Sequence, residues 1–513
     1  MRNHFKQKFP FVLVFTTGMC IMAVELTASR LLAPFFGTSL FVWTNIIAVI
    51  MAALAVGYWL GGKISERRPQ MSVLLKIIFA GGIFCYVIPF TTEPLSIYLL
   101  KDFAVFTPAS WLILISSFCA TLVLFFIPIM LVGMTSPFLI KLLSTSHSDV
   151  GNVSGTIFAI STVGSIIGTF LPSLVFIAWV GSKRTILIFA IVLIIISAYG
   201  LARRKQYIYL LGLLLIIGPF IIPTALRPEE STILETESVY QYIQVQEQEG
   251  MNLLRYNEGT GIQSIFHPDK FTTGHAYFDM MAASPALFEA DNLRVLNIGL
   301  AGGTAVRSMT HLFEGIKNIT IDGVEIDAKV IEIAEDHFDL NLENLTIHIA
   351  DGRVFTRLTK EKYELVLIDA YSNQVYIPWH LTTDEFFKEV EAVMYDDAIM
   401  AINLNATSVE SDLYQAVSNT IANNFEYVFS MQVPGSFNYL IFASNERIPF
   451  SRLIESEVVQ SSGLLFALVL YMVENAENIR YNQEIPILTD DKAPIEHMTD
   501  AMYWNLIFKG NNL

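Results

Sequence analysis

Three acidic side chains follow apolar runs in the second half of the sequence, where they could bind a polar ligand. Glu325, Asp351 and Asp369 each come at or just after the end of such a run. Because the carboxyl ends of parallel strands meet at one edge of a sheet, we expect the three carboxylates to face one crevice. A carboxylate can accept hydrogen bonds from both ribose hydroxyls, as we expect of Glu325, or from an adenine amino group, as we expect of Asp351. Asp369 would face the rest of the crevice.

A glycine-rich turn precedes these acids and adds a second signal for a nucleoside. Gly299, Ala301 and Gly303 lie in the sequence Gly-Leu-Ala-Gly-Gly-Thr, directly after an apolar run. Glycine at such a turn lets backbone amides approach a ligand closely. With Asp351 and the adjacent Gly352, the turn predicts an adenosine-containing ligand such as S-adenosylmethionine or its decarboxylated form. The spacing from the turn to the first acid also resembles a nicotinamide site, but the later acids fit methionine nucleosides better.

The elements that must position these residues alternate between strand and helix. This alternation predicts an α/β domain with a parallel, doubly wound sheet of the Rossmann type, like that of class I methyltransferases. Before it, short antiparallel strands at 239–246 and 253–256, followed by a turn at 258–261, predict a small β subdomain. The expected strands of the main sheet are 294–298, 319–324, 345–349, 365–368 and 398–403, and the expected helices are 304–313, 328–338 and 383–394.

The first part of the chain has long apolar stretches with few charges. A helix needs about 20 apolar residues to cross a bilayer, because its backbone must satisfy its hydrogen bonds internally there. We predict a multi-span α-helical membrane domain of about seven helices at 1–226, the β subdomain at 227–290 and the Rossmann-like nucleoside-binding domain at 291–513. The fourth stretch continues apolar through Pro128 and Pro137, so it is kinked or divided in two. The seven stretches are 10–32, 39–62, 72–90, 109–133, 153–180, 183–201 and 206–223.

Small residues recur at four-residue spacing in several of these stretches. Stripes of this kind let helix backbones approach closely in lipid, so we expect the helices to pack into a bundle. Glu25 lies deep in the first stretch, where a carboxylate is energetically costly, and it is either a polar contact between helices or part of a cavity. The stripes comprise Ala53, Gly57 and Gly61, then Gly155 and Ala159, then Gly164 and Gly168.

Charge differs sharply between the two halves. Residues 1–227 hold 16 Lys and Arg against 5 Asp and Glu, whereas residues 228–513 hold 16 against 43. The acidic half would repel phosphate backbones, so nucleic acid is not an expected partner; it would attract a polyamine, or simply remain soluble. The positive-inside rule with seven crossings leaves the acidic half outside, whereas a nucleoside made in the cytosol favours the cytoplasmic side. We therefore predict a multi-pass cell-membrane protein and leave the side of its acidic half open.

A set of short motifs between residues 240 and 405 occurs in a characteristic order. The motifs are Tyr240-Gln241, Tyr277, Ile298-Gly299 with Gly303, Glu325, Asp351-Gly352, Asp369 and Asp384-Glu-Phe-Phe387. In this order they resemble the spermidine synthase (polyamine aminopropyltransferase) family. The whole chain resembles the membrane-fused branch of that family, of which the segments 377–383 and 488–496 are typical.

The resemblance implies a role for each matching residue. Asp369 would accept the proton of the amine and is the predicted catalytic residue. Tyr277 and Asp279 are candidates for holding the amine, although Asp279 could equally be a solvent-facing helix residue. The nearby His275, His380 and His497 are interpreted as loop or structural histidines. The nucleoside-binding residues would be Gln241, Gly299, Ala301, Gly303, Glu325, Asp351 and Gly352.

The chain departs from the soluble members of this family on the polyamine side of the site. Phe278 replaces the His of their Tyr-His-Glu motif, and Gly302 replaces the Asp of their Gly-Gly-Asp-Gly turn. Ser372 stands where their Asp-x-x-Asp loop has its second Asp. The nucleoside side is intact. These departures therefore argue against putrescine as the acceptor more strongly than they argue against the nucleoside donor.

The resemblance implies a membrane-bound aminopropyltransferase of polyamine biosynthesis, which would move an aminopropyl group from decarboxylated S-adenosylmethionine to an amine and release methylthioadenosine. One alternative is a methyltransferase that uses S-adenosylmethionine; another is a non-catalytic nucleoside or polyamine sensor coupled to a transport-like bundle. No tightly bound cofactor and no metal are expected, since the three cysteines show no metal-ligand spacing. The expected partners are the nucleoside and amine substrates and the lipid bilayer, and a homo-oligomer is left open.

Overall fold

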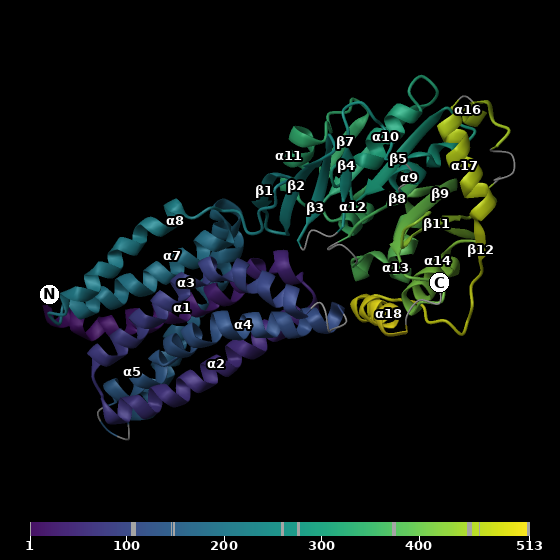
Figure 1. Cartoon of the computed structure of the whole chain (residues 1–513). Coiled ribbons are helices and arrows are strands. Elements are labelled where there is room, and N and C mark those ends of the chain that lie inside the picture. The colour runs from purple at the N-terminus through teal and green to yellow at the C-terminus, as the bar shows by residue number, and fades with distance from the viewer. Residues whose placement is uncertain are drawn as a thin grey trace. The chain divides into compact units, whose positions relative to one another are not determined.

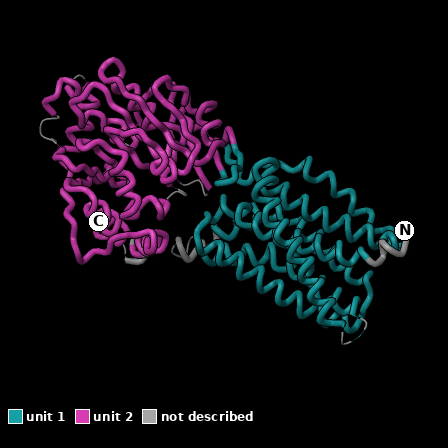
Figure 2. Tube along the Cα trace, turned by 180° about the vertical axis from the view of Figure 1, so that it is seen from behind, with its two compact units in different colours: residues 1–230, 235–242 teal, residues 231–234, 243–513 magenta. Residues whose placement is uncertain are grey.

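The computed structural model describes residues 2–103, 109–144, 146, 149–257, 261–273, 277–371, 376–448, 454–460 and 462–509. The chain forms two compact units, shown in Figures 1 and 2. The first comprises Met1–Glu230 and Glu235–Tyr242, and the second comprises Ser231–Leu234 and Ile243–Leu513.

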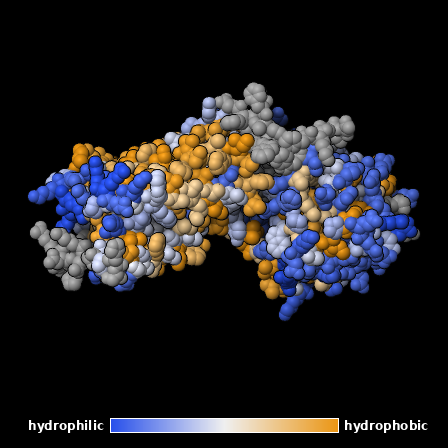
Figure 3. Space-filling model, turned by 90° about the horizontal axis from the view of Figure 1, so that it is seen from below, coloured by the Kyte–Doolittle hydropathy of each residue, from blue (hydrophilic) through white to orange (hydrophobic). Residues whose placement is uncertain are grey.

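The first unit is built from long apolar helices. Figure 3 shows apolar residues over the flank of this unit, whereas hydrophilic residues cover most of the second. Among the described residues, five helical segments are long and apolar enough to cross a membrane: Lys8–Phe36, Leu40–Arg67, Met71–Leu100, Leu114–Leu143 and Val150–Ala202. The helices of the unit are α1 (Arg2–Phe36), α2 (Leu40–Arg67), α3 (Met71–Phe103), α4 (Ala109–Gly133), α5 (Thr135–Leu143), α6 (Val150–Leu171), the π-helix η2 (Pro172–Phe176), α7 (Ile177–Ala202), the 3₁₀ helix η3 (Tyr207–Ile217) and α8 (Gly218–Ile221).

This arrangement differs from the predicted seven spans in the second half of the unit. The fourth stretch stays helical through Pro128 and breaks at Met134, between α4 and α5. The fifth and sixth stretches form one long segment, in which Gly181 interrupts the helical backbone with φ 80° and ψ 164°. The seventh stretch, Tyr207–Ile221, is mostly 3₁₀ helix and is shorter than the five spans. Among the described residues, five segments are therefore long and apolar enough to cross a membrane, and one of them, Val150–Ala202, contains both the fifth and the sixth predicted stretch.

The segment after α7 returns along that helix. Lys183, near the start of α7, donates a hydrogen bond to the carbonyl of Ala225. Two residues later in the chain, Arg227 donates to the carbonyl of Pro34, near the end of α1, at 3.0 Å. Residues 206–225 therefore run from the end of α7 back to its beginning.

Two of the three small-residue stripes lie at close helix contacts. A Cβ atom added at Gly164 of α6 would come 2.1 Å from the backbone oxygen of Phe15 in α1. One added at Gly57 of α2 would come 2.4 Å from the backbone oxygen of Met130 in α4. A Cβ atom at Gly155 would meet nothing within 4 Å. The close packing expected of such stripes holds for these two helix pairs and fails for Gly155.

Glu25 is half-buried in α1 and makes no hydrogen bond or ion pair with another described residue. The nearby Leu26 and Ser29 line a cavity of about 130 Å³, but Glu25 does not. The structure therefore supports neither of the two interpretations of Glu25.

After the helical unit the chain forms two sheets. The smaller sheet has the strand order β1-β2-β3-β4, in which β2 and β3 correspond to the two predicted antiparallel strands, whereas β1 and β4 were not predicted. The larger sheet has the order β12-β10-β11-β9-β8-β5-β6-β7. The strands are β1 (Thr232–Glu237), β2 (Tyr242–Gln248), β3 (Met251–Tyr256), β4 (Ser264–Phe266), β5 (Asn292–Ile298), β6 (Asn318–Glu325), β7 (Leu345–Ile349), β8 (Tyr363–Ile368), β9 (Met394–Asn405), β10 (Tyr427–Gln432), β11 (Asn438–Ser444) and β12 (Glu477–Ile479).

Helices cover the large sheet on both faces. Alternate strand residues enter two separate cores: Val295 and Leu367 pack into one, and Leu296 and Val366 into the other. Burial on both faces explains why these strands read as nearly continuous apolar runs. The helices of this unit are α9 (Tyr277–Ala282), α10 (Thr304–Leu312), α11 (Ala328–His337), α12 (Gly352–Leu358), α13 (Asp384–Ala392), α14 (Asp412–Asn424), α16 (Glu457–Gln460), α17 (Gly463–Asn475) and α18 (Ile495–Lys509), with the 3₁₀ turns η4 (Ser284–Leu287) and η5 (Trp379–Leu381).

The strand directions define where a ligand would bind. Strands β7, β6, β5, β8 and β9 are parallel, whereas β11, β10 and β12 extend the sheet with antiparallel pairings. The chain order reverses between β5 and β8, and sheets of this type bind ligands at the carboxyl ends of such strands. The predicted Rossmann-type fold is confirmed, and the antiparallel extension is an addition that the sequence pattern did not predict.

Candidate active site

The glycine-rich turn and Asp369 emerge side by side where the strand order reverses. In the register of β5 and β8, Ile298 lies opposite Ile368. The amide of Asp369 donates to the carbonyl of Ile298 over 2.8 Å. Gly299 has a φ of +88°, and a Cβ atom there would come 2.3 Å from the carbonyl oxygen of Asp369. Only glycine fits at this position, so the turn and the carboxyl group share one site.

The carboxyl group of Asp369 is held by hydrogen bonds in a desolvated position. Asn403, in β9, donates from Nδ2 to its Oδ1 over 2.9 Å, and Asn438 donates to the Asn403 Oδ1 over 2.9 Å, which fixes the orientation of the amide. Burial raises the pKa of Asp369 to about 6, and hydrogen bonds from Asn403 and Tyr277 limit this rise. Burial and the charge of Asp369 also raise the pKa of the Tyr277 hydroxyl, so it stays a neutral donor. At neutral pH, Asp369 is therefore a carboxylate of increased basicity.

Glu325, at the end of β6, is tied to the same turn. Its Oε2 accepts from the amide of Ala301 over 2.9 Å, and its Oε1 accepts from the amide of Asp327 over 3.1 Å. Burial raises the pKa of Glu325, while these two backbone donors oppose the rise. A carboxylate has about four acceptor positions, so Glu325 retains capacity for ligand hydroxyls. Gly303 completes the turn with a φ of +76°, where a Cβ atom would lie 2.1 Å from a side-chain carbon of Leu340.

A cavity of about 20 Å³ lies between the turn and the carboxyl group. Gly299, Ala301 and Asp369 line it, together with Asn297 and Phe278. Phe278 is buried and gives the cavity an apolar wall. The space is roughly that of one water molecule. Two residues of the predicted nucleoside turn, Gly299 and Ala301, therefore meet the predicted catalytic Asp369 around a compact, partly apolar space.

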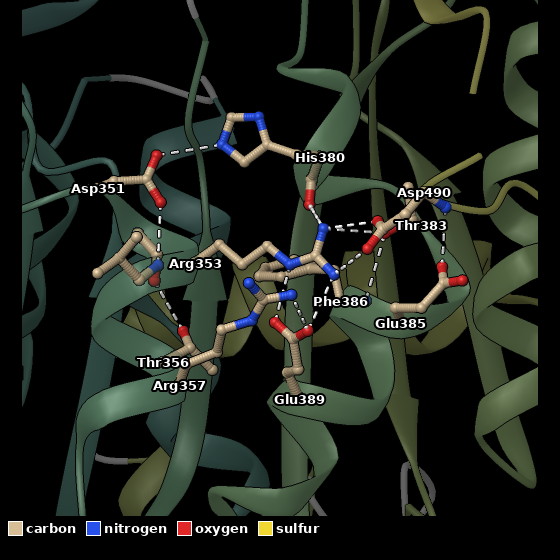
Figure 4. A network of polar contacts seen from close by, with 12 residues as sticks. Asp351, Arg353, Thr356, Arg357, His380, Thr383, Glu385, Phe386, Glu389 and Asp490 are labelled. Carbon is tan, nitrogen blue, oxygen red and sulfur yellow. Dashed lines mark hydrogen bonds and ion pairs between the residues drawn. The ribbon is translucent and has the colours of Figure 1, made fainter. Parts of the chain in front are cut away.

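Asp351 lies at the next strand end and caps α12. Its Oδ1 accepts from the amide of Val354 over 2.9 Å, and its Oδ2 lies 3.1 Å from Nε2 of His380, as Figure 4 shows. The hydrogen bond with His380 is the main reason that the pKa of Asp351 lies below its ordinary value. A Cβ atom at Gly352 would come 2.3 Å from the side chain of Ile298, so α12 packs directly on β5. His380 thus orients a predicted adenine-binding residue.

Arg353 joins the two segments that resemble the membrane-fused branch. Its guanidinium makes two hydrogen bonds to Glu389 of α13, at 2.8 and 2.9 Å, and two to Asp490, at 2.6 and 2.8 Å (Figure 4). It also donates to the carbonyl of His380 over 3.1 Å, and Thr383 donates its hydroxyl to Asp490 over 2.8 Å. The segments 377–383 and 488–496 therefore meet beside Asp351.

Asp279 and His497 are not among the residues that line the small cavity. Asp279 is fully buried and accepts from the amide of Thr273 at 2.8 and 3.1 Å, so its interpretation as a solvent-facing residue is wrong; it does not line the small cavity. Gln241 belongs to the first unit, where its amide donates to the Ser238 hydroxyl over 3.0 Å. His275 and Ser372 lie outside the described residues. His497 is in α18.

Asn403, which holds the carboxyl group of Asp369, was not among the residues predicted from the sequence. It lies near the end of β9, the strand parallel to β8, and therefore in the same relation to the sheet edge as the three acids. The strand-end argument that selected Glu325, Asp351 and Asp369 would have selected Asn403 if amides had been considered with carboxylates.

Comparison with known proteins finds similarity over the part of the chain that carries this site. Residues 274–444 match the family model described as "Spermine/spermidine synthase domain". A Bifidobacterium longum protein named "Probable polyamine aminopropyl transferase" is 32% identical over 288 residues, which cover 52% of this chain and 62% of that protein. A Vibrio vulnificus polyamine aminopropyltransferase is 28% identical over 279 residues, which cover 52% of this chain and 91% of the relative.

Solved structures show similarity over about half of the chain. The crystal structure of a spermidine synthase in complex with the transition state analogue AdoDATO covers 52% of this chain at 18% identity, with a TM-score of 0.37. The chain spans less than two thirds of the length of the Bifidobacterium longum relative. The matched segment contains the glycine-rich turn, Glu325, Asp351 and Asp369. The C-terminal half of this chain therefore contains a spermidine synthase domain.

Proposed function

We propose that the protein is a membrane-embedded aminopropyltransferase, which moves the aminopropyl group of decarboxylated S-adenosylmethionine to an amine and releases methylthioadenosine. The observation that carries the proposal is the carboxylate of Asp369, which lies beside the glycine-rich turn and is held by Asn403 and Tyr277. The names of the similar proteins support this activity.

The reaction is an in-line displacement at carbon. The amine nitrogen attacks the aminopropyl carbon bonded to the sulfonium, a C–N bond forms, and the C–S bond breaks with its electron pair going to sulfur. The sulfonium is a good leaving group, so the protein mainly aligns the reactants and removes one proton from the amine. A protonated amine has no free electron pair, and Asp369, with its pKa of about 6, is a carboxylate at neutral pH and can take that proton.

The donor nucleoside would lie across the strand ends. Glu325 would accept hydrogen bonds from the ribose hydroxyls, and Asp351 with Gly352 would hold the adenine, as in the family that the motifs resemble. The free acceptor positions of Glu325 and the fixed orientation of Asp351 support these roles.

Membrane insertion is supported by the surface of the first unit. Large apolar side chains on its helices are exposed, including Trp59 at 62%, Leu174 at 66% and Trp179 at 83%. Exposed apolar surface of this extent would be unfavourable in water and favourable in lipid. We therefore propose a multi-pass membrane protein.

The test is to incubate the full-length protein in detergent with decarboxylated S-adenosylmethionine and a panel of amines, and to measure methylthioadenosine by chromatography. Release that depends on the amine and is lost in Asp369→Asn would support the proposal. No release with any amine would contradict it.

Methyl transfer is a second candidate, which the polyamine side of the site favours. Phe278 and Gly302 stand in place of a histidine and an acid that soluble spermidine synthases carry, and a methyl donor would need neither. The same assay with S-adenosylmethionine distinguishes the two functions, since methyl transfer yields S-adenosylhomocysteine. Nucleoside binding without either product would instead indicate a sensor.

A further inference from the structure

A second, larger cavity lies in the same unit as the site but is not used by the proposed chemistry. It has a volume of about 490 Å³ and lies between α10 and the segment that follows β4. Thr304 lines both this cavity and the small cavity beside Asp369, so the two adjoin. The polar side chains that line the larger cavity include Arg307, Lys270, His267, Thr273 and Ser308.

Arg307 is buried at this cavity, and its guanidinium lies over two aromatic rings. Only 9% of the residue is exposed. Its guanidinium carbon lies 4.5 Å from the ring centre of Phe266 and 4.9 Å from that of Phe271. Aromatic rings attract a cation through their faces but accept none of its in-plane N–H bonds. The edge of the guanidinium must therefore find acceptors elsewhere.

The protein itself provides few acceptors for that edge. Among the described residues, the two terminal nitrogens of Arg307 donate only to the carbonyl of His267, both at 3.5 Å. Among the described residues Arg307 forms no ion pair, and Asp339 acts on it only at longer range. Burial accordingly lowers the pKa of Arg307. A buried guanidinium with so few partners is costly unless a ligand completes its hydrogen bonds.

A hydroxyl group at the same cavity also lacks a partner. The Thr273 hydroxyl is buried and makes no hydrogen bond with a described residue. Its position is fixed, because the backbone amide of Thr273 donates to the buried carboxylate of Asp279. Two independent polar groups at one cavity, one charged and one neutral, are thus left to bind something else.

The charge of the cavity is opposite to that of its surroundings. Lys270 is exposed at its rim, and Nδ1 of His267 accepts from the amide of Asp269 over 3.0 Å, which leaves Nε2 as the donor in the neutral ring. No acidic side chain is among the residues that line the cavity. This local excess of donors contrasts with the 43 acidic against 16 basic residues of the C-terminal half.

We propose that this cavity is a binding site for a compact oxyanion, a phosphate or carboxylate group, with Arg307 as its principal ligand and Thr273 and Lys270 as further donors. Arg307 can hold two oxygens of such a group side by side through its in-plane N–H bonds. The group is either a free anion or the anionic end of the amine acceptor. The second source rests on the proposed function; the first does not.

Calorimetric titration of the full-length protein in detergent with inorganic phosphate, in a phosphate-free buffer, tests the site. We expect saturable binding with one phosphate per chain. Arg307→Gln should weaken it at least tenfold and Thr273→Val several-fold, whereas Lys388→Gln, which removes a cation from α13, should change it less than twofold. Absence of saturable binding, or equal affinity in Arg307→Gln, would overturn the proposal.

Two further measurements keep the test decisive. Thermal unfolding would reveal whether Arg307→Gln is unfolded. In that case the phosphate affinities of Thr273→Val and Lys270→Gln replace it as the test, and wild-type affinity in both variants would overturn the proposal. The source of the anion follows from transfer rates with a linear diamine and with the ω-amino acid of equal chain length. If the KM for the amino acid is lower than that for the diamine, and this difference disappears in Thr273→Val, the bound anion is the carboxylate of the acceptor. If the two KM values are equal and phosphate binds, the site holds a free anion. Transfer to no amine would sink the proposed function and leave the phosphate result standing.

Discussion

Two opposing effects determine the pKa of the Asp369 carboxyl group, and this pKa determines whether the group can act as a base. Burial disfavours its charge, while donors from Asn403 and Tyr277 favour it, and burial wins, so that the pKa rises to about 6. Asp369→Asn should lower turnover at least about 100-fold, because a general base is lost. Nucleoside affinity should stay within a few-fold, as measured by calorimetry with methylthioadenosine. Substantial remaining activity with an unchanged pH profile would assign the base to another group.

The same balance has a consequence for stability. Between the ordinary pKa of an unfolded Asp, about 4, and the folded value of about 6, the folded state binds more protons than the unfolded state. The free energy of unfolding therefore falls as pH rises through this window. Asp369→Asn should be more resistant to denaturant than the wild type at pH 7.5, and this advantage should shrink at pH 4.5. Equal stability at both values would argue against the raised pKa.

The hydrogen bond from Tyr277 to Asp369 should influence the pH at which activity is lost in acid. Turnover requires the Asp369 carboxylate, so kcat/KM should fall as pH drops through about 6. Tyr277→Phe removes a donor to the carboxylate, which should raise the pKa of Asp369 further and move the acidic limb of the pH–rate profile to higher pH. Tyr471→Phe, whose hydroxyl donates to the Gln432 carbonyl in another part of the unit, is the control. An unmoved limb in Tyr277→Phe would remove this tyrosine from the site.

Glu325 should contribute to the affinity for the nucleoside rather than to turnover chemistry. Glu325→Gln keeps the size of the side chain and one acceptor for the Ala301 amide, but removes the charge that would accept ribose hydroxyls. The expected loss is about 1–3 kcal/mol of binding free energy. Titration with methylthioadenosine measures it, and an affinity equal to that of the wild type would place the ribose elsewhere.

Glycine spacing determines how closely the helices of the first unit pack. A Cβ atom at Gly168 of α6 would come 2.0 Å from the backbone oxygen of Met19 in α1, whereas one at Gly155 of the same helix would meet nothing. Gly168→Leu should destabilise the unit by about 1–3 kcal/mol, because the helices must separate. Gly155→Leu is the matched control and should be neutral. Thermal unfolding in detergent compares them, and equal melting temperatures would show that the contact does not matter.

The strands around the site could be predicted from the sequence because each is an apolar run with a polar residue at its end. Glu325 and Asp369 emerge at strand ends because parallel strands buried on both faces must carry their polar residues there. The partner of Asp351 could not be predicted, since His380 reaches it from a segment 29 residues later whose path depends on Arg353 and Asp490. Long-range polar contacts of this kind leave no local pattern.

In the first unit, the apolar stretches could be predicted from the sequence, but the conformation of each stretch could not. Hydropathy measures apolar length but does not detect backbone conformation, so it could not show that the stretch 206–223 winds largely as a 3₁₀ helix. It also divided 153–201 near Gly181 without showing that this glycine adopts a positive φ inside one long segment. The stripes that contain Gly57 and Gly164 did predict which helix faces pack closely, because the spacing of small residues depends on helix packing and not on the length of the apolar stretch.

The boundary between the two units lies near the change in composition at Arg227, but the chain passes from one unit to the other more than once. The segment Glu235–Tyr242 follows the start of β1 but belongs to the first unit. Glu237 is buried there, and its carboxylate accepts from the amide of Ser182 over 2.6 Å and from the hydroxyl of the same residue. Burial raises the pKa of Glu237 to about 7, and the Ser182 donors oppose the rise. A residue of the later part of the sequence thus completes the fold of the helical unit.

This boundary leads to a prediction about the isolated C-terminal half. A protein of residues 228–513 should fold, since both cores of the large sheet lie wholly within it. It should nevertheless bind nucleoside more weakly than the full-length protein, because Glu237 loses Ser182 and the segment that carries Gln241 loses the unit on which it folds.

Gln241→Ala in the full-length protein separates the two causes. If Gln241 contacts the nucleoside, this variant should weaken binding as much as truncation does, and Gln241→Ala in the truncated protein should add nothing further. Titration of all four proteins with methylthioadenosine gives the comparison. Equal affinity of the truncated and full-length proteins would show that the helical unit does not order the nucleoside site and would leave membrane attachment as its contribution.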